Sequence, residues 1–318
     1  MNRKLVAITV ASIVIVSIVA YYYFSGAGRS KETIKVSGAW ALYPMMVKWA
    51  EEYQKIDSNV IIEVSAGGAG KGMADALAGL VDIGMVSREI YPEEIQKGAF
   101  YVVVTKDAVV ATMNKDNPVL NDILTKGLTN QMFYNIYIAG NITTWGQVVS
   151  RLDVTDEIHV YTRSDACGAA ETWAKYLGKK QEDLQGVGVY GDPGLLEAVR
   201  NDRLGIGFNN IGYAYDIQTK QQVEGIKVIP IDVNENGQVD SEENFYNTKN
   251  EIVEAIVQGV YPSPPARNLH LVTKGAFTGA AKKFVKWILT GGQIYVEEAG
   301  YVPFSQDIIN EQLNKLEG

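Results

Sequence analysis

Apolar and polar residues follow two different periods along the chain, and together these periods predict strands that alternate with helices. Residues 33–38 and 60–66 are short apolar-rich runs typical of strands, and residues 81–88 have the pattern of a buried strand. Between the first two runs, residues 43–56 carry an apolar stripe with helical spacing. The stripe consists of Met45, Met46, Trp49, Tyr53 and Ile56. This alternation predicts an α/β fold, a sheet with helices on both faces.

The first three predicted strands each end in a turn of small or polar residues. These turns are residues 38–41, 66–70 and 87–88. In sheets flanked by helices, ligands collect at the carboxyl ends of the strands. We therefore expect the three turns to lie together at one edge of the sheet and to form part of a binding site.

A long apolar run over residues 100–119 predicts a pair of strands interrupted at Lys106 and Asp107. We interpret the interruption as the crossover into a second lobe, from which the chain returns near residue 220. The expected organisation is a separate segment of residues 1–30, a first lobe made of residues 31–106 and 220–318, and a second lobe made of residues 107–219.

The first 30 residues form a segment of their own. Arg3 and Lys4 precede an uncharged run over residues 5–24, which suits a membrane-spanning helix of about 20 residues better than the shorter apolar core of a signal peptide. The basic start places the remainder of the chain outside the cytoplasm. We expect a single-pass anchor in the cell membrane; the alternative is cleavage after Ala20 or Ala27.

Charge and cysteine content exclude several classes of protein. The chain has 37 acidic and 29 basic residues and a net charge of -8, so nucleic acid is not an expected partner, because phosphate backbones require a basic face. Cys167 is the single cysteine, so no intramolecular disulfide can form. The two histidines, His159 and His270, stand apart in strand-like runs, which does not fit a zinc site.

The sequence contains no recognisable catalytic motif. The glycine-rich run of residues 65–73 lacks the spacing and the final Ser or Thr of a P-loop, and it does not contain G-x-G-x-x-G. G-x-S-x-G and H-E-x-x-H are also missing. Because nothing pairs a nucleophile with a base, we expect a binding protein rather than an enzyme.

Residues 163–178 combine a charged pair with a helix start. Arg163 and Asp165 precede a small-residue turn, and such a turn suits an anion because the N–H groups at a helix start carry partial positive charge. The Ser, Thr, Asp or Asn usual at a helix start is absent. The turn reads Ala166, Cys167, Gly168, Ala169, Ala170.

Eight motifs occur in the order found in phosphate-binding proteins of ABC transporters, and the chain resembles that family over about residues 33–305. The motifs are VSGAWALYPMMVKWAEEY, VSAGGAGKGM, DIGMVSREI, NKDNPV, GNITTWGQVV, RSDACGAAETW, GIGFNNIGYA and GQIYVEEAGYVPF. The resemblance implies a two-lobed periplasmic-binding-protein fold, in which the lobes close on a ligand about a hinge.

The resemblance also implies an oxyanion site. In that family, backbone amides and Ser or Thr hydroxyls of three helix-starting turns hold the anion, an Arg pairs with it, and an Asp orients this Arg. The corresponding ligand-binding positions in this chain are Gly38, Ala39, Trp40, Ala41, Gly68, Ala69, Ser87, Arg88, Arg163, Ser164, Asp165, Cys167, Gly168 and Ala169. The family's residues are retained at Ser87, Arg88, Arg163, Ser164, Asp165 and Gly168.

Most of the hydroxyls are replaced, and this changes the expected binding. The replacements are Ala39, Ala41, Ala69, Cys167 and Ala169. Each lost charge-assisted hydrogen bond costs about 1.5–3 kcal/mol, so we expect phosphate to bind more weakly than in the family. Trp40 either contacts a less polar ligand or plugs the cleft, or it packs between the lobes. Cys167, near Arg163, either ionises more easily than a free thiol or fills a Ser-sized space.

Residues 232–243 match the calcium-loop pattern D-x-[DN]-x-[DN]-G-x5-E. The expected calcium ligands are Asp232, Asn234, Asn236, Gln238, Asp240 and Glu243. Gly237 permits the sharp turn that such a loop needs. The preceding run, residues 226–231, looks like a strand rather than the entering helix of an EF-hand, so a solvated acidic turn is the alternative.

Two functions remain open. The first is a membrane-anchored extracytoplasmic solute-binding protein of phosphate type, which binds phosphate or a related oxyanion and feeds an ABC transporter permease. The second is a non-transport cell-surface protein that keeps the fold with a degenerate ligand site and acts through protein contacts. Ser87, Arg88, Arg163 and Asp165 favour the first, whereas the missing hydroxyls and Trp40 favour the second.

Overall fold

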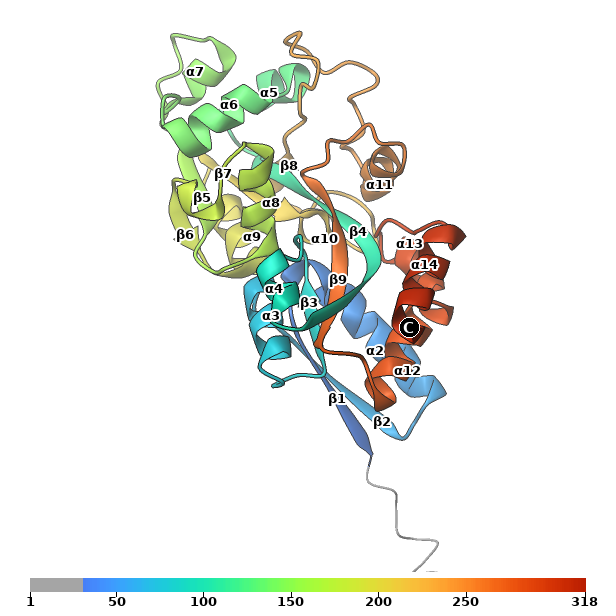
Figure 1. Cartoon of the computed structure of the whole chain (residues 1–318). Coiled ribbons are helices and arrows are strands. Elements are labelled where there is room, and N and C mark those ends of the chain that lie inside the picture. The colour runs from blue at the N-terminus through green and yellow to red at the C-terminus, as the bar shows by residue number, and fades with distance from the viewer. Residues whose placement is uncertain (1–30) are drawn as a thin grey trace, which may run out of the picture.

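The computed structural model describes residues 31–318; the expected membrane anchor falls in residues 1–30, outside the described residues. The chain forms two lobes joined by long strands (Figure 1). Each lobe has its own cluster of buried hydrophobic side chains. The predicted two-lobed α/β organisation is therefore confirmed. Between residues 31 and 318, no helix is long and apolar enough to span a membrane.

The first lobe is built on parallel strands flanked by helices. Its strands are β1 (Glu32–Gly38), β2 (Val60–Ala66) and β3 (Ile83–Val86), with β3 antiparallel to β9 (Ala266–Lys274). Its helices are η1 (Trp40–Leu42), α2 (Tyr43–Ile56), α3 (Ala69–Leu77), α4 (Pro92–Gln96), α12 (Gly279–Ile288), η4 (Gly291–Gln293), α13 (Ile294–Glu298) and α14 (Gln306–Glu317). The predicted stripe of α2 is buried except at Ile56, which is 66% exposed because it is the last residue of the helix.

The second lobe repeats this arrangement. Its strands are β5 (His159–Arg163), β6 (Val187–Val189), β7 (Gly205–Asn210) and β8 (Ile226–Val228). In its sheet β5 lies between β6 and β7, as β1 lies between β2 and β3. Its helices are α5 (Leu120–Lys126), α6 (Asn130–Tyr134), the π-helix η2 (Asn135–Ala139), α7 (Trp145–Val149), α8 (Gly168–Tyr176), η3 (Gln181–Asp183), α9 (Gly191–Asn201), α10 (Ile211–Ala214) and α11 (Lys249–Val257). The stacked rings of Trp173 and Phe208, 5.8 Å apart, lie in its core.

Two antiparallel strands, β4 (Ala99–Asn114) and β9, connect the lobes (Figure 1). The first part of β4 pairs with β9 and its last part pairs with β7 and β8, so β4 belongs to both sheets. The predicted pair of strands is therefore wrong, since residues 99–114 form one continuous strand. Asp107 does not interrupt it, because its cross-strand neighbour Arg267 supplies a charge of opposite sign.

The boundary expected at residue 220 is also corrected by the packing. Residues after 220, including Ile226, Ile231, Tyr246 and Ile252, are buried in the same hydrophobic cluster as residues 108–215. The second lobe therefore continues to about Ala266, where β9 begins. The chain that returns to the first lobe is β9 with α12, α13 and α14.

Candidate functional site

The turns after β1, β2 and β3 meet at one edge of the first-lobe sheet, as predicted. The carbonyl of Gly38 accepts hydrogen bonds from the N–H groups of Gly67 (2.9 Å) and Gly68 (3.0 Å). The N–H of Ala39 donates to the carbonyl of Met85 on β3 (2.9 Å). Backbone hydrogen bonds therefore hold the three strand ends together.

Glycine is required where α3 passes the ends of β1 and β3. A Cβ on Gly72 would lie 2.4 Å from the carbonyl oxygen of Met85 and 2.8 Å from the Cα of Gly38. Gly38 itself has φ of +133°, which L residues rarely adopt. The two glycines allow α3 to begin directly against the strand ends.

A turn of the second lobe closes on these three turns. The N–H of Gly70, at the start of α3, donates to the carbonyl of Ala166 (3.2 Å). A Cβ on Gly168, the first residue of α8, would lie 2.3 Å from both the carbonyl and the hydroxyl oxygen of Ser87. The start of α3, the end of β3 and the start of α8 therefore contact one another across the boundary between the lobes.

Several backbone N–H groups at this junction have no acceptor among residues 31–318. They belong to Trp40, Ala41, Ala69, Gly168 and Ala169, and we call them the amide cluster. All of these residues except Trp40 are buried. Because buried N–H groups in proteins are nearly always hydrogen-bonded, the amide cluster is a place where an anionic acceptor fits.

Arg163, the last residue of β5, is buried and held by two carboxylates. Its Nε and Nη2 donate to Asp165 (2.8 and 2.7 Å), and its Nη1 donates to Asp192 (2.6 Å). Burial lowers the pKa of Arg163, but the nearby acids, Asp192 foremost, outweigh burial and raise it. One guanidinium between two carboxylates leaves a net negative charge, so Arg163 does not present a free cation to a ligand.

The predicted pairing of Arg163 with Asp165 is present, but the sequence reasoning missed Asp192. Asp192 lies in the first turn of α9, where an acidic side chain is normally explained by the helix dipole. Its other oxygen accepts from the backbone N–H (3.0 Å) and the side-chain amide (2.8 Å) of Asn210. Only the packing of α9 against β5 and β7 brings this carboxylate to Arg163. Ser164, also predicted as a ligand contact, is exposed.

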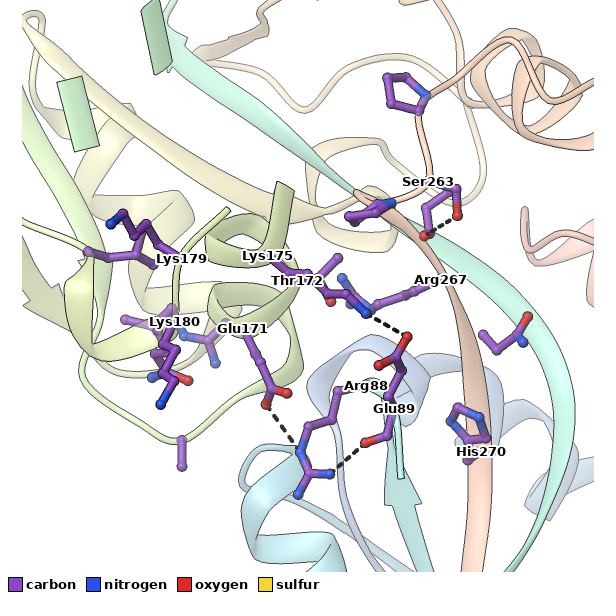
Figure 2. Close-up of a pocket in the computed structure, with 18 of the residues that line it drawn as sticks. Arg88, Glu89, Glu171, Thr172, Lys175, Lys179, Lys180, Ser263, Arg267 and His270 are labelled. Atoms are coloured by element: carbon purple, nitrogen blue, oxygen red, sulfur yellow. Dashed lines mark hydrogen bonds and ion pairs between the residues drawn. The ribbon is translucent and has the colours of Figure 1, made fainter. Parts of the chain in front are cut away.

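Arg88 joins the two lobes (Figure 2). Its Nη1 and Nη2 donate to Glu94 (2.9 and 2.6 Å), and its Nε lies 3.2 Å from Glu171 of α8. The hydroxyl of Tyr91 also donates to Glu171. Since two carboxylates occupy the guanidinium, direct contact between Arg88 and a ligand stays a prediction.

Cys167 takes the place of a hydroxyl residue before α8. Its Sγ accepts a hydrogen bond from the N–H of Ala170 (3.4 Å), as the oxygen of an N-cap Ser does. Burial raises the pKa of the Cys167 thiol to about 12, although Arg163 opposes this. The expectation that the thiol ionises easily is therefore wrong, and the packing and capping support the space-filling interpretation.

Trp40 packs on the second lobe. Its ring meets the ring of Tyr190 edge-on, with 6.1 Å between the centroids, and a Cβ on Gly191 would lie 3.1 Å from it. The hydroxyl of Tyr213 donates to the backbone carbonyl of Trp40 (3.3 Å). All three partners belong to the second lobe, so the contacts favour the packing interpretation over contact with a ligand.

Residues 232–243 form a loop whose two end carboxylates turn inward. Asp232 accepts hydrogen bonds from the N–H groups of Asn236 (3.2 Å) and Gly237 (2.9 Å), and Glu243 accepts from the N–H of Asn234 (3.1 Å). Within residues 31–318, no group of three or more His, Cys, Asp and Glu side chains is placed to hold a metal ion. The calcium site stays a prediction.

The fold and the amide cluster define a two-lobed binding protein with a candidate anion site between its lobes. A family profile described as "PBP superfamily domain" matches residues 25–291. The chain therefore belongs to this periplasmic-binding-protein-like superfamily. The family is one of substrate-binding proteins, which are not enzymes.

Relatives of similar sequence include a phosphate-binding protein. The chain is 27% identical to Protein SphX of Synechococcus elongatus over 87% of this chain and 79% of that protein. It is 26% identical to the phosphate-binding protein PstS of Xylella fastidiosa over 90% of this chain and 85% of that protein. Both similarities extend over both lobes.

Solved structures share the fold. A putative phosphate ABC transporter substrate-binding protein with bound phosphate, from Clostridium perfringens, matches with a TM-score of 0.69 and 24% identity over 86% of this chain and 100% of that chain. An ABC-type phosphate transport receptor from Vibrio cholerae matches with a TM-score of 0.59 and 22% identity over 85% and 99%.

Proposed function

We propose that the chain is an extracytoplasmic solute-binding protein that binds phosphate or a related oxyanion at the amide cluster and delivers it to an ABC transporter. The observation that carries the proposal is the set of N–H groups without acceptors at Trp40, Ala41, Ala69, Gly168 and Ala169. They come from three helix starts, where the N–H groups and the helix dipole both favour an anion. The relatives named as phosphate-binding proteins support the choice of ligand.

Backbone groups would supply most of the binding energy. The side chains at Ala41, Ala69 and Ala169 have no hydroxyl, and Arg163 is neutralised by Asp165 and Asp192. A site with amide donors but without a free cation binds an anion less tightly than one with both, because charge-assisted hydrogen bonds are the stronger kind. We therefore expect weak phosphate binding rather than none.

A carboxylate placed in the amide cluster tests this function. Ala69→Asp would bring a negative charge to the first turn of α3, where it competes for the same N–H groups and repels an incoming anion. Ala74→Asp places the same charge at an exposed position of the same helix. In titration calorimetry with inorganic phosphate, the first variant should lose binding and the second should keep it. Equal binding by the two variants would show that phosphate does not use the amide cluster.

The membrane attachment belongs to the same proposal. Residues 5–24 supply an uncharged run with Arg3 and Lys4 before it, and this arrangement suits a single-pass anchor with the lobes outside the cytoplasm. An anchor would keep the lobes close to a permease in the same membrane. A permease is the partner that a solute-binding protein of this kind requires.

The non-transport alternative has support of its own. Arg88 and Arg163 are each occupied by two carboxylates, and Trp40 packs on the second lobe. Of these contacts, the pair of Arg88 with Glu171 and the packing of Trp40 on Tyr190 join the two lobes through protein groups. Such a junction suits a surface protein that acts through protein contacts. Absence of phosphate binding, together with unchanged lobe contacts, would favour this alternative.

We also propose that residues 232–243 bind one Ca²⁺ as a structural ion. The motif supplies the oxygen ligands at the spacing of a calcium loop, with Asp232 and Glu243 as its charged ends. Gly237, at the sixth position, has φ of +83°, the backbone conformation for which glycine is needed there. The other proposed ligands are Asn234, Asn236, Gln238 and Asp240.

A further inference from the structure

A cavity of about 1450 Å³ lies between α8, β9 and the segment that precedes β9 (Figure 2). Both lobes line it, with Arg88 and His270 from the first and Thr172 and Lys175 from the second. Binding sites for small organic molecules are commonly about 300–1,000 Å³, so the cavity has room for a ligand far larger than inorganic phosphate.

The cavity is basic although the chain is acidic. Seven Lys and Arg residues and four Glu residues line it, while the whole chain has a net charge of -8. Ion pairs occupy Arg88, Arg163, Lys175 and Arg267. The remaining cations of the lining are Lys106, Lys179 and Lys180. This local excess of positive charge favours an anion.

Arg267 is one of three buried arginines of this lining, with Arg88 and Arg163. Its side chain is 7% exposed, and its Nη2 donates to the side chain of Asn210 and lies 3.5 Å from Asp107. Its Nε and Nη1 have no hydrogen-bond partner among residues 31–318. Figure 2 shows the side chain pointing from β9 toward Thr172 on α8.

Buried guanidinium N–H groups without acceptors are unfavourable, because their lost hydration is not replaced. Burial lowers the pKa of Arg267, and Asp107 offsets this only in part. An anionic group in the cavity would supply the acceptors that Nε and Nη1 of Arg267 lack.

We propose that this cavity is a second anion site, separate from the amide cluster, for an organic molecule that carries a carboxylate or a phosphate monoester. The anionic group accepts hydrogen bonds from Nε and Nη1 of Arg267. The organic body extends toward the exposed Lys179 and Lys180, which add long-range attraction. Because both lobes line the cavity, an occupied site stabilises the contact between the lobes.

Titration calorimetry on the full-length protein tests the proposal with citrate and glycerol 3-phosphate as probes, each with and without saturating inorganic phosphate. We expect at least one probe to bind, to bind equally in both conditions, and to lose about tenfold or more in affinity in Arg267→Gln. The probe that binds identifies the anionic group. Failure of both probes, or displacement of the probe by phosphate, would overturn the second site.

A surface variant keeps the test decisive if Arg267→Gln does not fold. The double variant Lys179→Ala, Lys180→Ala changes exposed residues only, and we expect several-fold weaker probe binding, a smaller salt dependence and an unchanged melting temperature. The control is Lys282→Ala, Lys283→Ala, which removes two neighbouring lysines of α12 outside the cavity lining. Equal probe affinity in the two double variants would contradict the proposal.

Discussion

The Nε atom of Arg88 lies 3.2 Å from a carboxylate oxygen of Glu171, and the two residues belong to different lobes. The side chains are only 9% and 27% exposed, so water screens the pair weakly. Burial raises the pKa of Glu171, although Arg88 opposes the change. The pair is therefore a contact between the lobes that depends on the charge of one carboxylate.

We predict that Glu171→Gln shifts the lobes toward a more open arrangement, because the amide keeps the shape of the side chain and removes its charge. The radius of gyration from small-angle X-ray scattering should increase relative to the wild type. Glu182→Gln is the matched control, since Glu182 lines the same cavity and lies on η3. The same radius in both variants would mean that the pair does not hold the lobes.

His270 should make stability fall in mild acid. Burial lowers the pKa of this side chain to about 4. The unfolded chain takes up the proton near pH 6.5, whereas the folded chain does so only near pH 4, so the free energy of unfolding decreases as the pH falls between these values. At 1.36 kcal/mol per pKa unit, the full decrease is about 3 kcal/mol.

Urea unfolding between pH 4.5 and 7.5 checks this prediction. His270→Gln should have a shallower dependence of the free energy of unfolding on pH than the wild type. His159→Gln is the control, because His159 is the other histidine of the chain and is exposed on β5. A slope in His270→Gln as steep as that of the wild type would contradict the assignment to His270.

Restoring hydroxyls should tighten phosphate binding. The triple variant Ala69→Ser, Cys167→Ser, Ala169→Thr adds hydroxyl groups, which can donate hydrogen bonds to an anion. They lie at the starts of α3 and α8, two of the helix starts that form the amide cluster. We expect a gain of about tenfold or more in phosphate affinity by calorimetry, at roughly 1.4 kcal/mol per power of ten. Arg163→Ala should remove binding, because it leaves Asp165 and Asp192 uncompensated beside the site. If neither variant changes binding, the cleft is not an anion site.

Calcium should raise the melting temperature. Binding to the native state alone stabilises it by mass action, and the loop of residues 232–243 is folded only in the native state. Glu243→Gln should abolish the rise, because it removes the last ligand of the motif. Glu242→Gln alters the adjacent exposed acid and should leave the rise intact. No effect of calcium on the wild type would exclude the site.

The N-terminal segment should stay attached to the mature protein. The uncharged run over residues 5–24 is long for the core of a signal peptide. Intact mass measurement on protein extracted from its own membranes should therefore show the full chain. A mature chain that begins between Tyr21 and Arg29 would instead show that the segment is cleaved.

Features that depend on neighbouring residues could be predicted from the sequence. The stripe of α2 follows from the spacing of apolar residues, and the meeting of the strand ends follows from the order of strands and helices. The glycines at 38 and 168 matched known motifs, and the structure shows why their size matters. The predicted lobe boundary was wrong because residues 226–231 have the same strand pattern whichever lobe they join.

Charge partners across the fold could not be predicted. Asp192 reaches Arg163 only because α9 packs against β5 and β7, and Glu171 reaches Arg88 only because the lobes meet. The sequence shows the retained arginines but not the carboxylates that occupy them. The strength of the candidate anion site depends on those carboxylates, so it could not be judged from the motifs.

Ala108 on β4 and Ala266 on β9 are register partners, so the second lobe begins and ends at adjacent points. In a chain synthesised from its N-terminus, that lobe has all its core residues except Val302 once Ala266 has been made. The first lobe still lacks the rest of β9 with α12, α13 and α14. The order of synthesis therefore allows the second lobe to fold as an inserted unit while the first lobe waits for the last part of the chain.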